Sequence, residues 1–173
     1  MTVSLHTAVV GTYQQMLPQL LWNLDKAEKH CTETGMSFDA LGEARLAPDM
    51  WTLAKQISQS AHHSARAIEA VRKGSFSPDP DPIPSDLSLV RKEIKDAIVL
   101  VNAVQPGELD AIAHNDMQFR AGKYSMMFDV SDFLMTFSLP NFYFHVTTTY
   151  NILRTNGVQL GKADFIGFMR NRK

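Results

Sequence analysis

The stretch that decides the fold is Leu139-Pro140-Asn141-Phe142-Tyr143-Phe144-His145-Val146-Thr147-Thr148-Thr149-Tyr150-Asn151-Ile152-Leu153-Arg154. Its apolar residues recur at helical spacing, which predicts the second part of a long helix near the C-terminus. Asn141 and His145 are four residues apart, so they lie one above the other on a single helical face. Two helical side chains at this spacing are a common beginning of a metal site, although an amide is a poor ligand for zinc-like ions.

Residues 131–138, directly before this stretch, continue the same helical periodicity. Three earlier segments of the chain show it too. Gly35 and Gly74 follow two of these segments and are typical of helix C-caps. Asp49 is placed to begin the second helix and Ser131 to cap the fourth. Trp51, at the start of the second helix, is expected to pack where helices converge. The predicted helices span residues 5–31, 49–73, 85–104 and 131–156.

The connections between these helices complete the predicted fold. Residues 36–48 form a connection with a short helical turn at 38–41, and residues 75–84 contain alternating prolines that exclude helix and disfavour a paired strand. Residues 109–119 and 123–130 flank Arg120-Ala121-Gly122 and predict a β-hairpin. We therefore predict a single all-α domain over residues 1–173: a four-helix up-down bundle with a long crossover and a small hairpin between helices three and four.

Composition narrows the range of partners. The chain has 173 residues, with 17 basic and 18 acidic side chains. This balance lacks the excess of basic residues that is typical of proteins that bind nucleic acid or an anionic membrane. No apolar run approaches the roughly 20 residues that span a bilayer, and the first residues lack the features of a signal peptide, so we expect a cytoplasmic protein. Cys31 is the single cysteine and has no partner for a disulfide or a CxxC motif.

Three stretches carry a resemblance to a known family. They are Leu46-Ala47-Pro48-Asp49-Met50, Leu139 to Thr148, and Asn156-Gly157-Val158-Gln159-Leu160-Gly161-Lys162. Together they resemble the DUF1993 family, which is similar to the DinB/YfiT-like superfamily of metalloenzymes. The resemblance covers almost the whole chain and is most specific in the fourth helix. It implies a DinB-like bundle, a fold that often forms homodimers.

The resemblance also implies a metal site. In typical DinB-like proteins, one histidine on helix two and two on helix four bind a divalent ion such as zinc or nickel. The last of these precedes an arginine by nine residues, and His145 stands in that relation to Arg154. Asn141 occupies the position of the other helix-four histidine, and Gln56 falls near the helix-two position, with His63 two turns further along as the alternative. The implied site is therefore His145, Asn141 and Gln56, and the chain departs from the family pattern at two of the three.

Several interpretations of these residues stay open. Gln56, Asn141 and His145 can form a hydrogen-bonded polar cluster, hold a divalent metal weakly, or bind a small organic ligand in the bundle core. His62 and His63 are adjacent on a helix and point about 100° apart, so they cannot chelate one ion together. The aromatic residues of the fourth helix are typical of a core, and they also offer a face that could pack a second copy.

Two functional hypotheses follow. In the first, the chain has a degenerate metal site, holds no metal, and serves as a binding or structural homodimer. In the alternative, it is a divalent-metal-dependent hydrolase or thiol transferase, as the superfamily implies, with His145 as a ligand and a metal that polarises a substrate atom or lowers the pKa of bound water.

Overall fold

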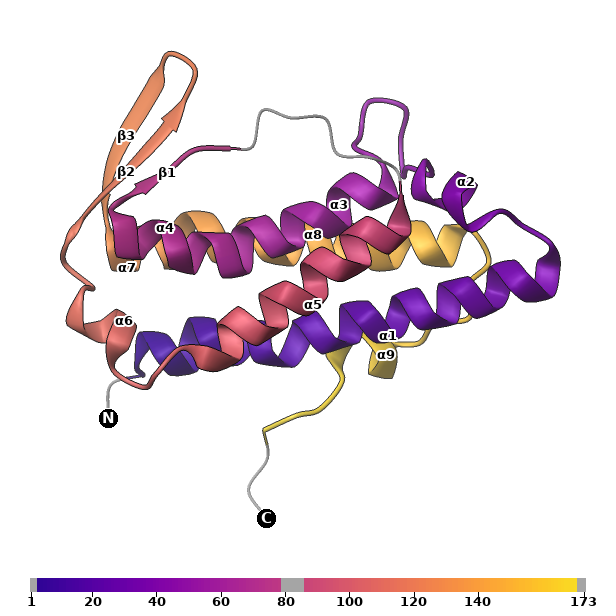
Figure 1. Cartoon of the computed structure of the whole chain (residues 1–173), viewed down its shortest axis with the longest axis horizontal. Helices are drawn as coiled ribbons and strands as arrows, with labels where there is room; N and C mark the ends of the chain where they lie inside the picture. The colour runs from indigo at the N-terminus through magenta and orange to yellow at the C-terminus, as the bar shows by residue number, and fades with distance from the viewer. Residues whose placement is uncertain (1–2, 79–85, 171–173) are drawn as a thin grey trace.

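Long helices account for most of the chain in the computed structural model, which describes residues 3–78 and 86–170 (Figure 1). The first helical segment consists of η1 (His6–Val10) and α1 (Gly11–Thr34), and it continues through Pro18. It ends at Gly35, whose φ of 73° is the left-handed conformation expected of a C-cap glycine. The prediction of a first helix closed by Gly35 is thus confirmed.

The second helical segment runs without a break through α3 (Leu53–Ala61), η2 (His62–Arg66) and α4 (Ala67–Lys73). Its predicted start at Asp49 is wrong. The chain makes a turn at this point, in which the Met50 N–H donates to the Ala47 carbonyl, and the helix begins only after Thr52. The Thr52 hydroxyl accepts from the Lys55 N–H and therefore provides the cap that the sequence assigned to Asp49.

The third and fourth segments also begin near, but not at, their predicted residues. Helix α5 spans Leu87–Ala103 and is capped by the Asp86 carboxylate, while the predicted start at Ser85 lies outside the described residues. The fourth segment begins at Val130 rather than after a Ser131 cap. It consists of α7 (Val130–Asp132), η3 (Phe133–Ser138) and α8 (Leu139–Thr155), and Pro140 falls at the join between π and α spacing.

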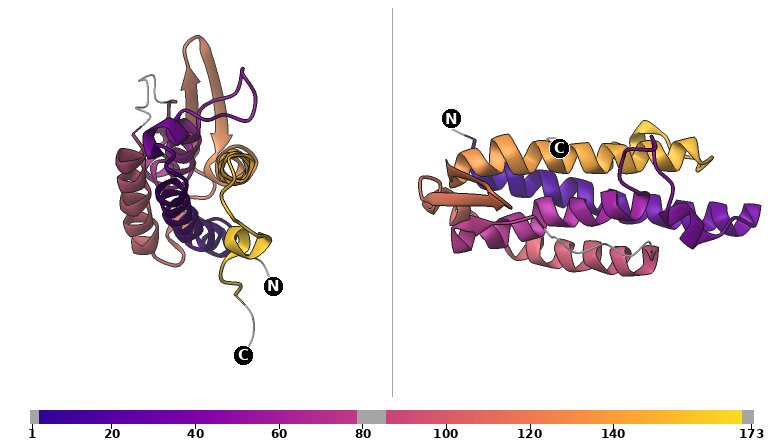
Figure 2. Two further views of the ribbon diagram at one scale, coloured as in Figure 1. Left: turned by 90° about the vertical axis from the view of Figure 1, so that its right-hand side faces the viewer. Right: turned by 90° about the horizontal axis from the view of Figure 1, so that it is seen from above.

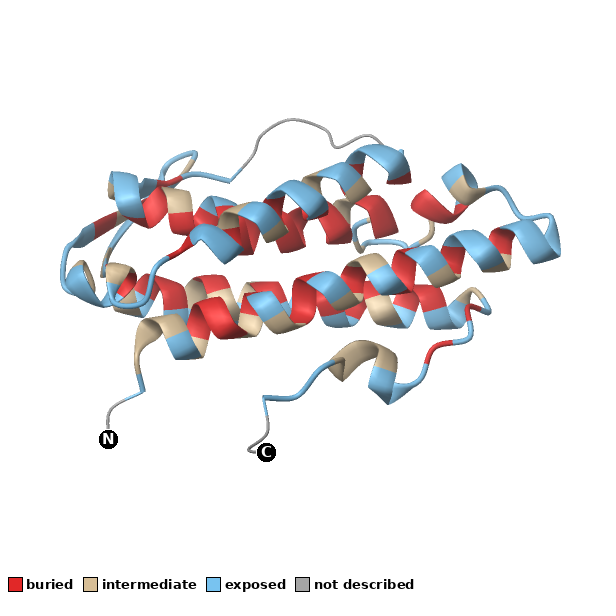
Figure 3. Ribbon diagram, turned by 60° about the horizontal axis from the view of Figure 1, so that its bottom comes forward, coloured by how far each residue is buried: buried red, intermediate tan, exposed pale blue. Residues whose placement is uncertain are grey.

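These segments bury their apolar faces against one another, and the buried residues lie between the helices in Figure 3. Contacts from Gln56 to His145 and from Ser138 to the His63 backbone show that α8 runs antiparallel to α3 and η2, since the partner number falls as the residue number rises. Figure 2 shows the same segments side by side in two further views. The core includes these fully buried side chains: Val9, Leu17, Leu24, Leu53, Ile57, Ile68, Leu87, Ile94, Val101, Phe133, Phe142 and Ile152.

A three-stranded sheet takes the place of the predicted lone hairpin. Strand β1 (Ser75–Phe76) pairs in parallel with β2 (Asp116–Ala121), which pairs antiparallel with β3 (Tyr124–Asp129). The expectation that the proline-rich crossover contains no paired strand is wrong for its first two residues, because its prolines begin only at position 78. The rest of this crossover, residues 79–84, lies outside the described residues.

The hairpin itself is confirmed, with shifted boundaries. Its turn is Gly122-Lys123, with Gly122 at a φ of 56°, rather than the predicted Arg120-Ala121-Gly122. The predicted start of its first arm at Leu109 is wrong, because residues there form the short helix α6 (Glu108–Ala111). Aromatic side chains join the sheet to the helices, and the rings of Phe119 and Phe137 lie 4.9 Å apart.

Two short helices complete the structure. Helix α2 (Phe38–Gly42) confirms the helical turn predicted in the first connection. Helix α9 (Lys162–Ile166) lies against α1, where Asp164 accepts from Trp22 at 2.7 Å and from Lys26 at 2.9 Å. The prediction of a mostly helical chain is confirmed, and the sheet and the short helices add to the helices that were predicted. Within residues 3–78 and 86–170, every helix is too short or too polar to cross a bilayer.

Candidate functional site

The four site residues predicted from the sequence line a single cavity. Its volume is about 340 Å³, and it opens between α3 and η2 on one side and α8 on the other. The turn that precedes α3 closes a third side. The lining residues are Asp49, Met50, Trp51, Gln56, His63, Asn141, Phe144 and His145.

His145 lies at the centre of this site, and one hydrogen bond defines both its position and its tautomer. The side chain is only 3% exposed, and its Nδ1 lies 2.7 Å from Oε1 of Gln56. An amide oxygen can only accept, so Nδ1 of His145 carries the proton and donates. The other ring nitrogen, Nε2, therefore keeps its lone pair. Gln56 thus orients His145, and its oxygen is already engaged there.

Two rings stack against the His145 imidazole. Trp51 lies nearly parallel to His145, with ring centroids 5.7 Å apart, and the His63 ring stacks on it with centroids 5.5 Å apart. Trp51 is half exposed and carries the Lys55 ammonium over its ring at 5.4 Å. Because α3 starts late, Trp51 lies on the loop before it, at the cavity mouth, rather than within the second helix as predicted.

Both imidazoles are held neutral. Burial lowers the pKa of His63 to about 3, with further lowering from the nearby His145 and His62. Burial likewise lowers the pKa of His145 to about 4, assisted by His62 and Lys55. At neutral pH the cavity therefore presents uncharged rings, which accept or donate hydrogen bonds without a formal charge. Nδ1 of His63 is buried with no hydrogen-bond partner among the described residues.

Asn141 reaches the cavity from α8, one turn before His145. Its Nδ2 donates to the Phe137 carbonyl at 2.7 Å, at the point where the helix changes from π to α spacing and Pro140 contributes no N–H. One N–H of the amide nitrogen is thereby engaged with the backbone. The carbonyl oxygen and the second N–H remain as the groups that Asn141 can offer to the cavity.

Irregular helical turns lie on both sides of the cavity. The π-helical turns η2 and η3 face each other, and the hydroxyl of the buried Ser138 donates to the backbone carbonyl of His63 at 2.8 Å. Such turns interrupt the regular backbone hydrogen bonding and occur frequently at functional sites. Here His63 and Asn141 lie on facing elements. The Ser138 side chain of η3 provides a hydrogen-bond donor to a backbone carbonyl of η2.

Asp49, Met50, Trp51 and Phe144 were not predicted as site residues. Asp49 had been assigned to a helix start and Trp51 to a place where helices converge. A signal was present, because Asp49 and Met50 belong to one of the stretches that resemble the family. Their position at the cavity depends on the path of the loop before α3, which hydrophobic periodicity does not predict.

The side chains present do not fit the metal site that the fold family implies. Two imidazoles, two amides and the Asp49 carboxylate line the cavity, and Gln56 already accepts from His145. In the described part of the chain, no three His, Cys, Asp or Glu side chains lie close enough together to hold a metal ion. Zinc and nickel sites take imidazole, thiolate or carboxylate ligands, usually three or more from the protein.

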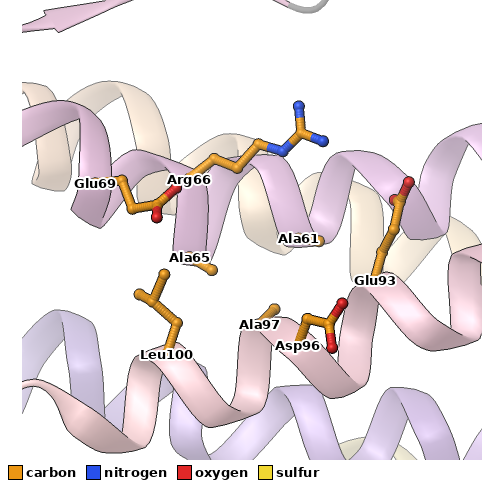
Figure 4. Close-up of a pocket in the computed structure, with 8 residues that line it drawn as sticks. All are labelled: Ala61, Ala65, Arg66, Glu69, Glu93, Asp96, Ala97 and Leu100. Atoms are coloured by element: carbon orange, nitrogen blue, oxygen red, sulfur yellow. The ribbon is translucent and has the colours of Figure 1, made fainter.

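A second hollow, of about 230 Å³, lies between the second helical segment and α5 (Figure 4). Alanine side chains, including Ala61 and Ala97, lie between the two helices and leave the space unfilled, while Arg66, Glu69 and Glu93 stand around it. Its lining contains no imidazole or thiol. Cys31 lies elsewhere, buried, and burial together with the nearby Glu28 raises the pKa of its thiol.

Comparison with known proteins agrees with this fold. The chain is similar over 98% of its length to a DinB family member from Shewanella denitrificans, known from a crystal structure, with a TM-score of 0.82 and 25% identity; the match covers 95% of that chain. No curated protein matches this chain. Residues 5–166 match the family described as "Domain of unknown function (DUF1993)". With this match over nearly its whole length, the chain belongs to the DUF1993 family.

Proposed function

We propose that this DinB-like bundle is a binding protein whose cavity between α3 and α8 takes a small, flat organic molecule, without a three-ligand metal. The observation that carries the proposal is the hydrogen bond from His145 to Gln56. It leaves a neutral imidazole with an available lone pair in a cavity of about 340 Å³, close to the lower limit for ligand pockets, which is roughly 300 Å³.

The walls define the class of ligand. Trp51, Phe144 and the His145 ring supply aromatic surface, which favours a planar ring. Nε2 of His145 and the carbonyl oxygen of Asn141 are acceptors, so the ligand should carry N–H or O–H donors. A polar ligand would also offset the cost of the unpaired Nδ1 of His63. A planar heterocycle with at least one N–H donor, such as an aminopyrimidine or a pyridone, meets these requirements.

The second candidate is the divalent-metal-dependent hydrolase or thiol transferase that the superfamily suggests. The same His145–Gln56 hydrogen bond supports it, since metal-binding histidines usually donate their other ring N–H to an acceptor. The donor set argues against it, because amides replace two of the three imidazoles expected of the family.

The test uses Trp51 as the reporter at the cavity mouth. In a Trp22→Phe variant, Trp51 is the only tryptophan, so its fluorescence reports the cavity alone. We expect 2-aminopyrimidine or 2-pyridone to change this fluorescence saturably, cyclohexanol to have no effect, and His145→Leu in the same background to abolish the response. His114→Leu, which alters an exposed histidine, is the matched control.

Zinc and nickel ions are tested in parallel, with Asn141→His as the positive control because it supplies a third imidazole. Stoichiometric ion binding by the Trp22→Phe protein that disappears in His145→Leu would overturn the proposal in favour of the metalloenzyme. A response to neither heterocycles nor ions would contradict both candidates and leave a hydrogen-bonded polar core.

A further inference from the structure

Strand β3 has one edge that no described segment covers. The sheet order is β1-β2-β3, so β3 pairs with β2 on one side only. In Figures 1 and 2 the hairpin formed by β2 and β3 extends away from the helices. An open edge of this kind presents unpaired N–H and C=O groups and is a ready template for another strand.

The side chains of β3 do not protect this edge in the usual way. Natural edge strands are commonly short, charged, bulged or interrupted by proline. Here Tyr124 is 65% exposed, Met126 45% and Met127 59%, and the strand is six residues long without a proline. Large apolar side chains on an uncovered, projecting strand indicate a surface that is covered by a partner.

The hairpin register determines which β3 residues direct their backbone groups outward. Ala121 pairs with Tyr124 and closes the two-residue turn Gly122-Lys123. The closing pair of such a hairpin is hydrogen-bonded, and hydrogen-bonded and non-hydrogen-bonded pairs then alternate. The N–H and C=O groups of Tyr124, Met126 and Phe128 therefore face β2, whereas those of Ser125 and Met127 face the open edge.

We propose that β3 pairs antiparallel with β3 of a second copy of this chain, about a two-fold axis at Met126. The outward-facing groups allow Ser125 of one copy to bond with Met127 of the other, in both directions. This register places Lys123 opposite Asp129 and Tyr124 opposite Phe128, each twice by symmetry. Opposite charges and aromatic pairs across strands are both stabilising.

The complementarity of the strand with itself is what selects a second copy. Lys123 and Asp129 are each three residues from Met126, with opposite charges, so the two-fold axis brings them together. Within its own chain Asp129 lies across from Asp116, a like charge, which a facing lysine would offset. The exposed aromatic residues of α8 provide no comparable register, and Phe144 there lines the cavity. The interface extends the sheet and does not depend on the function proposed for the cavity.

Disulfide trapping tests the register directly. In a Cys31→Ala background, which removes the single native cysteine, Met126→Cys places two thiols opposite each other on the axis. Non-hydrogen-bonded antiparallel pairs have Cα atoms about 4.5 Å apart, within the range of a disulfide. We expect a covalent dimer on mild oxidation. Tyr124→Cys is the matched control, because its two copies would be four residues apart along the strands, about 13 Å.

Charge exchange tests the same pairing without a covalent bond. Light scattering should give the mass of two chains for the unmodified protein and of one chain for Lys123→Asp, which puts two aspartates opposite each other. The double variant Lys123→Asp/Asp129→Lys should recover the dimer. An unmodified protein that stays monomeric at every concentration, or equal trapping of Met126→Cys and Tyr124→Cys, would overturn the proposal.

Discussion

At the scale of single residues, His63 and His145 couple stability to pH. Both are buried and have their pKa lowered from 6.5, to about 3 and about 4. Below pH 6.5 the unfolded chain takes up protons on these rings that the folded chain does not accept. The free energy of unfolding should therefore fall as the pH drops from 6.5 towards 4, by up to about 1.4 kcal/mol per pH unit for each histidine. Above 6.5 both states hold neutral rings, and the two histidines add no pH dependence.

Urea unfolding across this pH range measures the effect. His63→Leu should remove about half of the slope that the two buried histidines produce, since one of two proton-binding differences is lost. His114→Gln, which changes a ring that is 91% exposed, is the matched control and should keep the slope of the unmodified protein. Equal slopes in His63→Leu and the unmodified chain would show that His63 is not held neutral by the fold.

At the scale of elements, the segment around α9 comes very close to α1 at Gly167. Gly167 has a φ of 63°, and a Cβ at this position would lie 2.3 Å from the carboxamide of Gln19. Gly167→Ala should therefore loosen this segment, and the hydrogen bond from Trp22 to Asp164 should break with it. We expect the Trp22 fluorescence, measured in a Trp51→Phe background, to shift to longer wavelength, because the half-exposed indole loses its bond to Asp164 and becomes more solvated.

The control for this change is another glycine with a positive φ. Gly107 has a φ of 82° and nothing within 4 Å of a Cβ, so Gly107→Ala introduces backbone strain without a collision. It should cost about 1 kcal/mol of stability and leave the Trp22 emission unchanged. A shift of the same size in both variants would mean that general destabilisation, rather than release of α9, changes the fluorescence.

At the scale of the whole molecule, the cavity joins segments that are far apart in the sequence. Its lining comes from the turn at residues 49–51, from α3 and η2, and from α8. A ligand in the cavity should therefore bind only the folded chain and stabilise all of it by mass action, by about 2.7 kcal/mol at a concentration 100 times its Kd. Thermal unfolding with and without 2-aminopyrimidine or 2-pyridone measures this shift, and His145→Leu should abolish it. A ligand that changes Trp51 fluorescence but not the melting temperature would bind outside the folded cavity.

The sequence alone determined the four long helical segments and their order, because apolar periodicity and C-cap glycines are local signals. Gly35 and Gly74 end helices as predicted, and the hairpin before the fourth helix is present. The spacing of Asn141 and His145 places them on one face of a helix, and both side chains line the cavity. Boundaries were less accurate where two local signals competed, as at Asp49 and Thr52, because either side chain can cap a helix and only the path of the loop selects one.

Tertiary structure alone decided how the site residues meet. Gln56 and His145 are 89 positions apart, and their hydrogen bond depends on the antiparallel register of α3 against α8. The stacking of Trp51 and His63 on His145, and the burial that keeps both imidazoles neutral, depend on the same packing. Helical spacing predicts which side chains share a face of one helix. It contains no information on which face of another helix lies opposite, and that arrangement sets the chemistry of the cavity.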